Sequence, residues 1–106
     1  MHILIEIIEY VPNSVVSKTI IKKTTGNVSV MAIDTGEALE EKTSPFDTFI
    51  QIIEGAAEVI IDKKSNMLQT GDGIVIPAHT PNNFKANERF KMITTIIKSG
   101  YESISL

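Results

Sequence analysis

The sequence contains no cysteine and no tryptophan, and it has only two histidines, His2 and His79. Without cysteine the chain cannot form disulfides, thiolate metal sites or a cysteine nucleophile. Two histidines cannot supply the three imidazoles of a three-histidine zinc site within one chain. Several common kinds of catalytic centre are therefore excluded by composition.

The charges carry no strong bias toward one sign. Ten basic and thirteen acidic residues are mixed along the 106 residues, and the formal net charge is −3. Because there is no basic stripe, we expect no nucleic-acid partner.

Long hydrophobic runs are also missing. No window reaches the ~18 apolar residues that a membrane-spanning helix needs. The N-terminal run MHILIEIIEY is interrupted by Glu6, and it lacks a basic n-region and a small-residue cleavage site. We therefore expect a soluble, cytoplasmic protein with no membrane partner.

Residues that favour strands are abundant. The chain is 42% hydrophobic and 22% charged, which is typical of one globular domain, here residues 1–106. Isoleucine, valine and threonine recur, and few segments have the i, i+3, i+4 spacing of an amphipathic helix. About ten short strands, with turn signals at roughly 8–12-residue intervals, predict an all-β sandwich or barrel.

The N-terminal half gives three local expectations. A short helix is compatible with residues 2–10, but their β-branched side chains favour a strand. The strand predicted at residues 28–34 places two valines and an alanine on one face, with Met31 and Ile33 opposite. The short acidic segment 37–42 suits the solvated edge of a sheet.

In the C-terminal half, turn-forming residues separate the predicted strands. The runs 46–54 and 56–62 flank Glu54-Gly55 and predict a hairpin. Residues 62–66, DKKSN, predict a further hairpin loop. Pro77 is expected to end the apolar strand before it, since proline cannot donate the next ladder hydrogen bond.

Two glycine-based patterns have the spacing of a known pair of motifs. In the first, Gly36 is followed by five residues, Lys42-Thr43-Ser44, three residues, Thr48, six residues and Gly55. In the second, Gly71 is followed by five residues, Pro77-Ala78-His79, two residues and Asn82. Across residues 28–97 this spacing resembles the cupin superfamily. The resemblance implies an all-β jelly-roll barrel, also called a double-stranded β-helix.

The resemblance also identifies where a cupin would hold its metal. The four ligand positions of the family correspond to Lys42, Ser44, Thr48 and Asn82. A lysine would have to lose its proton to coordinate, and hydroxyl and amide oxygens do not replace imidazoles and a carboxylate for a transition metal. We therefore expect no metal at this position and no cofactor.

Each of these residues has a functional and a plain interpretation. Lys42 at the barrel mouth would bind an anion or, if desolvated, act as a nucleophile or base. Alternatively its stem lies on apolar surface while the ammonium group reaches water. Ser44, Thr48 and Asn82 would line a ligand pocket, or satisfy one another around trapped water.

His79 stands where the second motif usually has glycine. It would serve as a general acid or base at the pocket rim, or be an ordinary loop histidine. The plain interpretation is favoured, because no partner for His79 is evident in the sequence.

Three functions stay open. The first is a metal-free module that binds a small polar or anionic molecule with Lys42, Ser44, Thr48, His79 and Asn82, and this one is favoured. The second is a metal-independent isomerase or lyase that acts on a small polar substrate. The third is a non-catalytic protein-association module. A homodimer is expected in each case, with the isoleucine-rich N-terminus covering the edge of a partner's sheet.

Overall fold

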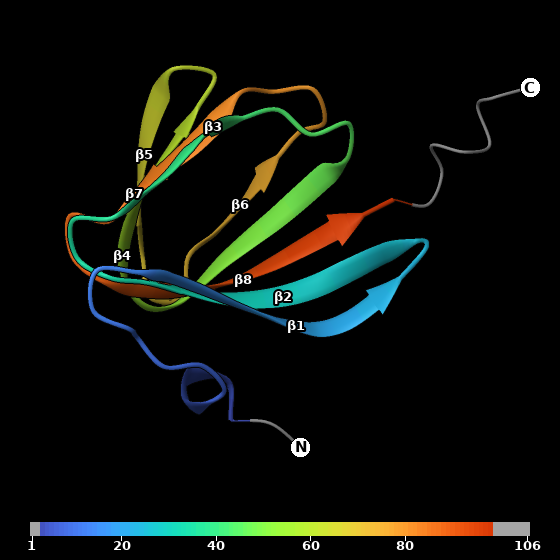
Figure 1. Ribbon diagram of the computed structural model, residues 1–106. Coiled ribbons are helices and arrows are strands. Elements are labelled where there is room, and N and C mark those ends of the chain that lie inside the picture. The colour runs from blue at the N-terminus through green and yellow to red at the C-terminus, as the bar shows by residue number, and fades with distance from the viewer. Residues whose placement is uncertain (1–2, 99–106) are drawn as a thin grey trace, which may run out of the picture.

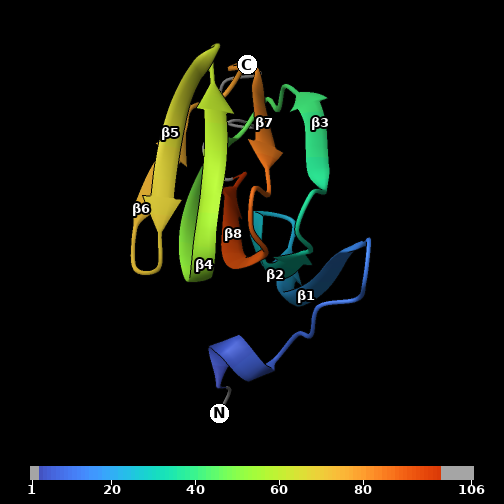
Figure 2. The ribbon, with the colours of Figure 1, turned by 90° about the vertical axis from the view of Figure 1, so that its left-hand side faces the viewer.

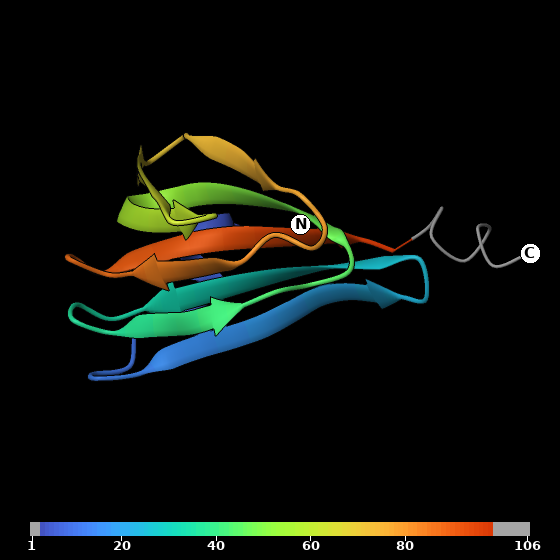
Figure 3. The same ribbon diagram turned by 90° about the horizontal axis from the view of Figure 1, so that it is seen from above.

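A computed structural model of the chain describes residues 3–98, which form eight β-strands preceded by one short 3₁₀ turn (Figure 1). The turn η1 is Leu4–Glu6, and the strands are β1 (Val15–Lys23), β2 (Gly26–Ile33), β3 (Ala38–Lys42), β4 (Asp47–Ile61), β5 (Lys64–Gln69), β6 (Gly73–Ile76), β7 (Asn82–Lys85) and β8 (Phe90–Ile97). We call β1-β2-β8-β4-β6 the large sheet and β3-β7-β4-β5 the small sheet. All the pairings are antiparallel, and the two sheets face each other as layers of one barrel (Figures 1 and 3). The predicted all-β jelly roll is confirmed.

Strand β4 belongs to both sheets and makes the corner between them. Its first half pairs with β6 and β8, and its second half pairs with β5 and β7. The register with β8 shifts between Ile52 and Glu54, which marks a β-bulge. Gly55 follows with a φ of +85°, and a Cβ there would lie 2.3 Å from the carbonyl oxygen of Arg89. The hairpin predicted around Glu54-Gly55 is wrong, because this bulge bends one continuous strand and does not reverse it.

Other local predictions are confirmed. A two-residue turn joins β4 to β5, and both of its residues, Asp62 and Lys63, have positive φ, as a type I′ hairpin turn requires. The acidic segment forms β3 at the edge of the small sheet. On β2, Val30 and Ala32 pack on one side of the large sheet, while Ile33 packs on the other.

The N-terminal segment does not join a sheet, so the strand predicted over residues 2–10 is wrong. The segment lies against the outer face of the large sheet, on the side away from the small sheet (Figures 1 and 2). There Ile8 is buried against Val30 and Ala32, with Ile7 and Tyr10 packed at the margin. Burial of this apolar patch outweighs the strand preference of the isoleucines. His2 lies outside the described residues.

The main core lies between the two sheets, beside the β4 corner. Phe90, which pairs with Gly55, is fully buried there, together with Ile52 and Ala57. Toward the opposite end of the strands the space between the sheets is less completely filled. No helix within residues 3–98 is long and apolar enough to cross a membrane.

Candidate functional site

A cavity of about 170 Å³ lies between the two sheets, at the end of the barrel away from the Gly55 corner. Its apolar wall consists of Met31, Ile50, Ile76, Phe84, Met92 and Ile96. Its polar wall consists of Lys42, Ser44, Thr48, Asn82 and Thr94. An apolar cavity with a few convergent polar groups is the usual form of a small-molecule site.

Strand pairing explains why these side chains meet. Lys42 at the end of β3 lies directly opposite Asn82 at the start of β7, so both project from the same face of the small sheet. Thr48 lies opposite Ile96 of β8 and Ile76 of β6 on the inner face of the large sheet. The structure thus brings together four of the five predicted site residues around one cavity.

The fifth residue, His79, does not line the cavity. It is exposed in the loop after β6, and its backbone N–H donates a hydrogen bond of 2.6 Å to the carbonyl oxygen of Ser44. Its φ is +63°, in the left-handed region that the glycine of the motif adopts without strain and that histidine tolerates better than β-branched residues. His79 thus retains the backbone role of that glycine.

Asn82 is held in a fixed orientation. It is 2% exposed, and its Nδ2 donates to the carbonyl oxygens of Lys42 (3.2 Å) and Thr80 (3.1 Å). These two bonds use both amide hydrogens and settle which end of the amide is the oxygen. The Oδ1 atom is buried and has no hydrogen-bond partner in the described part of the chain. An unpaired buried acceptor of this kind costs about 1–3 kcal/mol.

Thr94 is a lining residue that the sequence prediction missed. Its Oγ1 atom is also buried and unpaired among residues 3–98. The signal was present in the alternation of β8, where Met92, Thr94 and Ile96 share the inward face. A threonine within an otherwise apolar inward row is the feature that would have identified it.

The cavity does not suit the metal that many cupins hold. Its possible donors at the family's four ligand positions are an ammonium group, two hydroxyls and an amide, and no carboxylate or imidazole is among the described lining residues. Within residues 3–98 no group of three or more His, Cys, Asp or Glu residues is placed to hold a metal ion. The residues present therefore do not fit a transition metal.

The outer face of the large sheet carries a different polar cluster. Lys91 is 7% exposed, and its Nζ contacts the carbonyl oxygen of Ile5 and lies 3.6 Å from Glu54 Oε2. Tyr10 donates a hydrogen bond of 3.2 Å to Glu54 Oε1, and the cations of Arg89 and Lys91 lie 4.6 and 5.0 Å from the centre of its ring. Burial, followed by the negative charge of Glu54, raises the pKa of Tyr10 from 10.0 to about 12.

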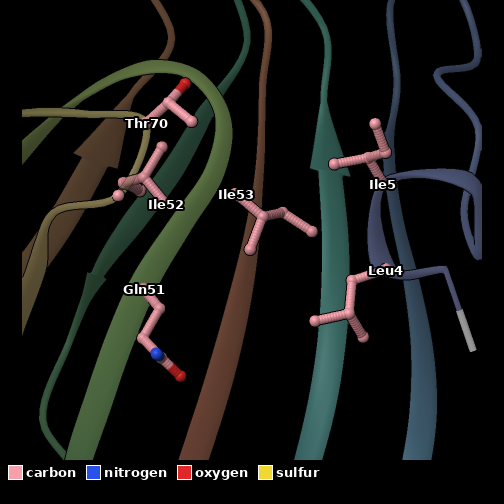
Figure 4. A pocket seen from close by; sticks show the side chains of 7 residues that line it. Leu4, Ile5, Gln51, Ile52, Ile53 and Thr70 are labelled. Carbon is pink, nitrogen blue, oxygen red and sulfur yellow. The ribbon is translucent and has the colours of Figure 1, made fainter.

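An open groove of about 420 Å³ lies beside this cluster. Leu4 and Ile5 of the N-terminal segment form one side, and Gln51, Ile53 and Thr70 lie on the other (Figure 4). Although this groove is larger than the cavity, its described lining carries no charged side chain. The interior cavity is therefore the better candidate for a specific site.

Comparisons with known proteins agree with this architecture. The sequence matches no family model and no curated protein. Among solved structures, a conserved Streptococcus pyogenes protein of unknown function is 29% identical, with a TM-score of 0.78 over 82% of this chain and 76% of that chain. A cupin superfamily protein from Desulfitobacterium hafniense is 27% identical, with a TM-score of 0.82 over 85% of this chain and 83% of that one.

A third solved structure is a cupin 2 conserved barrel domain protein from Leptotrichia buccalis. It is 29% identical, with a TM-score of 0.87 over 90% of this chain. The present chain spans 46% of that protein's length. The barrel and these neighbours show that the chain has the cupin fold.

Proposed function

We propose that this cupin barrel binds a small polar or anionic molecule in its interior, without a metal ion. The observation that carries the proposal is the cavity of about 170 Å³, in which Lys42, Ser44, Thr48 and Asn82 meet an apolar wall. The ammonium group of Lys42 supplies positive charge, and the hydroxyl and amide groups supply directional hydrogen bonds. His79 belongs to this proposal only as the residue that ties its loop to Ser44.

The lining favours binding over catalysis. A metal-independent isomerase or lyase needs groups that donate and accept protons at the substrate. Lys42 is the only ionisable side chain among the described lining residues, and His79 is exposed outside the cavity. We therefore propose a binding or sensing module, with no cofactor and with no nucleic-acid or membrane partner. A cytoplasmic location belongs to the same proposal.

A thermal-shift screen with divalent metals and a library of small metabolites tests this function. A ligand present at a hundred times its Kd stabilises the folded state by about 2.7 kcal/mol. We expect at least one small-molecule hit and no stoichiometric effect of Mn²⁺, Fe²⁺, Ni²⁺ or Zn²⁺. A metal that co-purifies at one equivalent and stabilises the protein would contradict the proposal, and so would a library without any hit.

Lys42→Met assigns the hit to the cavity. Methionine keeps much of the stem and removes the charge, so an anionic hit should lose at least tenfold in affinity. Lys85→Met is the matched control, because Lys85 is an exposed lysine on β7 that does not line the cavity. Equal losses in both variants would show that the anion responds only to overall charge.

Homodimer formation is a separate part of the proposal. Strand register aligns Ile21, Val28, Thr95, Phe49 and Val75 in one row across the outer face of the large sheet. Phe49 is 37% exposed and Val75 is 55% exposed, so the row offers apolar area to a second copy.

Sedimentation velocity tests the dimer. Val75→Lys places a charge in the row and should yield a monomer, whereas the wild-type protein sediments as a dimer. Met67→Lys serves as the control, since Met67 is equally exposed on β5 of the small sheet. A monomeric wild type, or a Val75→Lys variant that remains dimeric, would remove this part of the proposal.

A further inference from the structure

We infer that the ligand of the interior cavity carries a hydroxyl group beside its anionic end, and that its class is the short-chain hydroxycarboxylic acids. The inference rests on the proposed function, because it assumes that the cavity holds a small molecule. It starts from two buried polar atoms without a partner among residues 3–98, Asn82 Oδ1 and Thr94 Oγ1, whose side chains line the cavity from opposite sheets.

The Asn82 oxygen can only accept a hydrogen bond. Both hydrogens of its Nδ2 are already donated to the carbonyl oxygens of Lys42 and Thr80, so the amide cannot turn round to offer a donor. A carboxylate or another fully ionised anion has no hydrogen to give. The ligand must therefore present a donor at this point, in addition to any negative charge near Lys42.

The Thr94 hydroxyl can donate or accept. A hydroxyl group on the ligand meets both needs, because it donates through its hydrogen and accepts at its oxygen. The remaining wall, which includes Ile50, Met92 and Ile96, offers contact only to hydrocarbon. These requirements describe a short aliphatic acid with one hydroxyl substituent.

The size of the cavity limits the length of the acid. A cavity of about 150 Å³ holds benzene. The present cavity of about 170 Å³ therefore accepts roughly six to eight non-hydrogen atoms. A sugar phosphate or a nucleotide is too large for it.

Matched probes test the inference by isothermal titration. The probes are 2-hydroxybutyrate and 3-hydroxybutyrate, with butyrate as the analogue that lacks the hydroxyl group. We expect at least one hydroxybutyrate to bind tenfold or more tightly than butyrate, because a site built around hydrogen bonds rejects a ligand that leaves its polar groups unpaired. If both hydroxybutyrates bind no more tightly than butyrate, the inference is overturned.

Thr94→Val assigns the preference to the cavity. Valine has nearly the shape of threonine without the hydroxyl, so the preference for the hydroxy acid should fall at least threefold. Thr95→Val is the control, because the neighbouring threonine belongs to the outward-facing row with Val28 and Phe49. An unchanged preference in Thr94→Val, or an equal fall in both variants, overturns the assignment. Asn82 is left intact, since its Nδ2 bonds hold the β3 end and the β7 loop together.

The outcomes separate this inference from the proposed function. Equal binding of butyrate and the hydroxybutyrates would retain a small-anion site and remove the hydroxyl requirement. Failure of all three probes, together with a metabolite library that gives no hit, would remove both. A cavity that holds only water would give this second result, and it would likewise remove both the inference and the proposed function.

Discussion

The two faces of the large sheet bury polar groups in different ways. On the outer face, the buried Lys91 has the carbonyl oxygen of Ile5 and the carboxylate of Glu54 as partners, and Tyr10 hydrogen-bonds to the same carboxylate. On the inner face, the Oγ1 atom of Thr94 is buried in the same strand, β8, but it has no hydrogen-bond partner among the described residues.

This difference indicates that the polar cluster on the outer face has a structural role, whereas the cavity on the inner face is a candidate binding site. Lys91 and its partners attach the N-terminal segment to the sheet, and each group in that cluster is accounted for within the fold. By contrast, two side chains that line the cavity each have a buried polar atom without a partner among residues 3–98. Removing a polar group should therefore weaken the fold on the outer face, whereas removing the Thr94 hydroxyl from the inner face should not.

The largest expected effect comes from Glu54→Ala. It leaves the charge of Lys91 buried with one partner fewer and removes the acceptor for Tyr10. Breaking a fully buried pair costs about 3–5 kcal/mol, and because the Glu54 side chain is 41% exposed we expect a loss of about 1–2 kcal/mol in the free energy of unfolding. Urea denaturation measures this loss.

A second substitution sharpens this test. Adding Lys91→Met to Glu54→Ala removes the buried charge itself, so part of the lost stability should return. Glu58→Ala, on the second half of β4, is the control. Its carboxylate accepts hydrogen bonds from Ser65 and Asn87 at an exposed site, so it should matter less. A Glu58→Ala effect as large as that of Glu54→Ala would contradict the comparison.

Tyr10→Phe should have an intermediate effect. It removes the hydrogen bond to Glu54, with an expected loss of about 1 kcal/mol at neutral pH. The pKa of Tyr10 is about 12 in the folded protein and 10.0 in the reference state, so the folded state retains a proton that the unfolded state has released between these values. Stability should therefore decline as pH rises from 10 toward 12.

The same substitution checks this pH dependence. The decline attributable to Tyr10 should be absent in Tyr10→Phe when the two proteins are unfolded by urea across that range. In the ultraviolet titration of the folded protein, the phenolate transition near pH 12 should disappear with Tyr10. A decline of the same slope in both proteins would assign it to other groups.

The smallest effect, and one of opposite sign, is expected for Thr94→Val. Replacing an unpaired buried hydroxyl with a methyl group of similar shape should raise the free energy of unfolding by about 0.5 kcal/mol. Thermal unfolding without ligand measures this change. A loss of 1 kcal/mol or more, by the scale of an ordinary hydrogen bond, would mean that Thr94 is paired within the fold after all.

The fold was predictable because local turn chemistry and strand alternation agree with it. The spacing of glycine and proline located the barrel corners. The alternation of side chains along β2 correctly placed Val30 and Ile33 on opposite faces of the sheet. The N-terminal segment was not predictable in this way, since its isoleucines pack on a sheet face formed by residues distant in sequence. Glu54-Gly55 has the composition of a hairpin turn, and only the close approach of Arg89 identifies it as a bulge.

The site was predictable in part. The motif positions gave Lys42, Ser44, Thr48 and Asn82, which do line the cavity. The exposure of His79 has no short-range signal, whereas the inward alternation of β8 would have identified Thr94 as a lining residue. The polar atoms left unpaired become visible only once the hydrogen bonds of Asn82 are known.

We propose that the inner face of the barrel holds a small ligand where many cupins hold a metal. A high-resolution crystal structure of the protein grown with the tightest-binding hydroxy acid tests it most directly. We expect ligand density in the cavity, with a hydroxyl within about 3.2 Å of Asn82 Oδ1 and the carboxylate directed at Lys42. A metal ion at this position, or a ligand lying only in the outer groove beside Leu4 and Ile5, would contradict it.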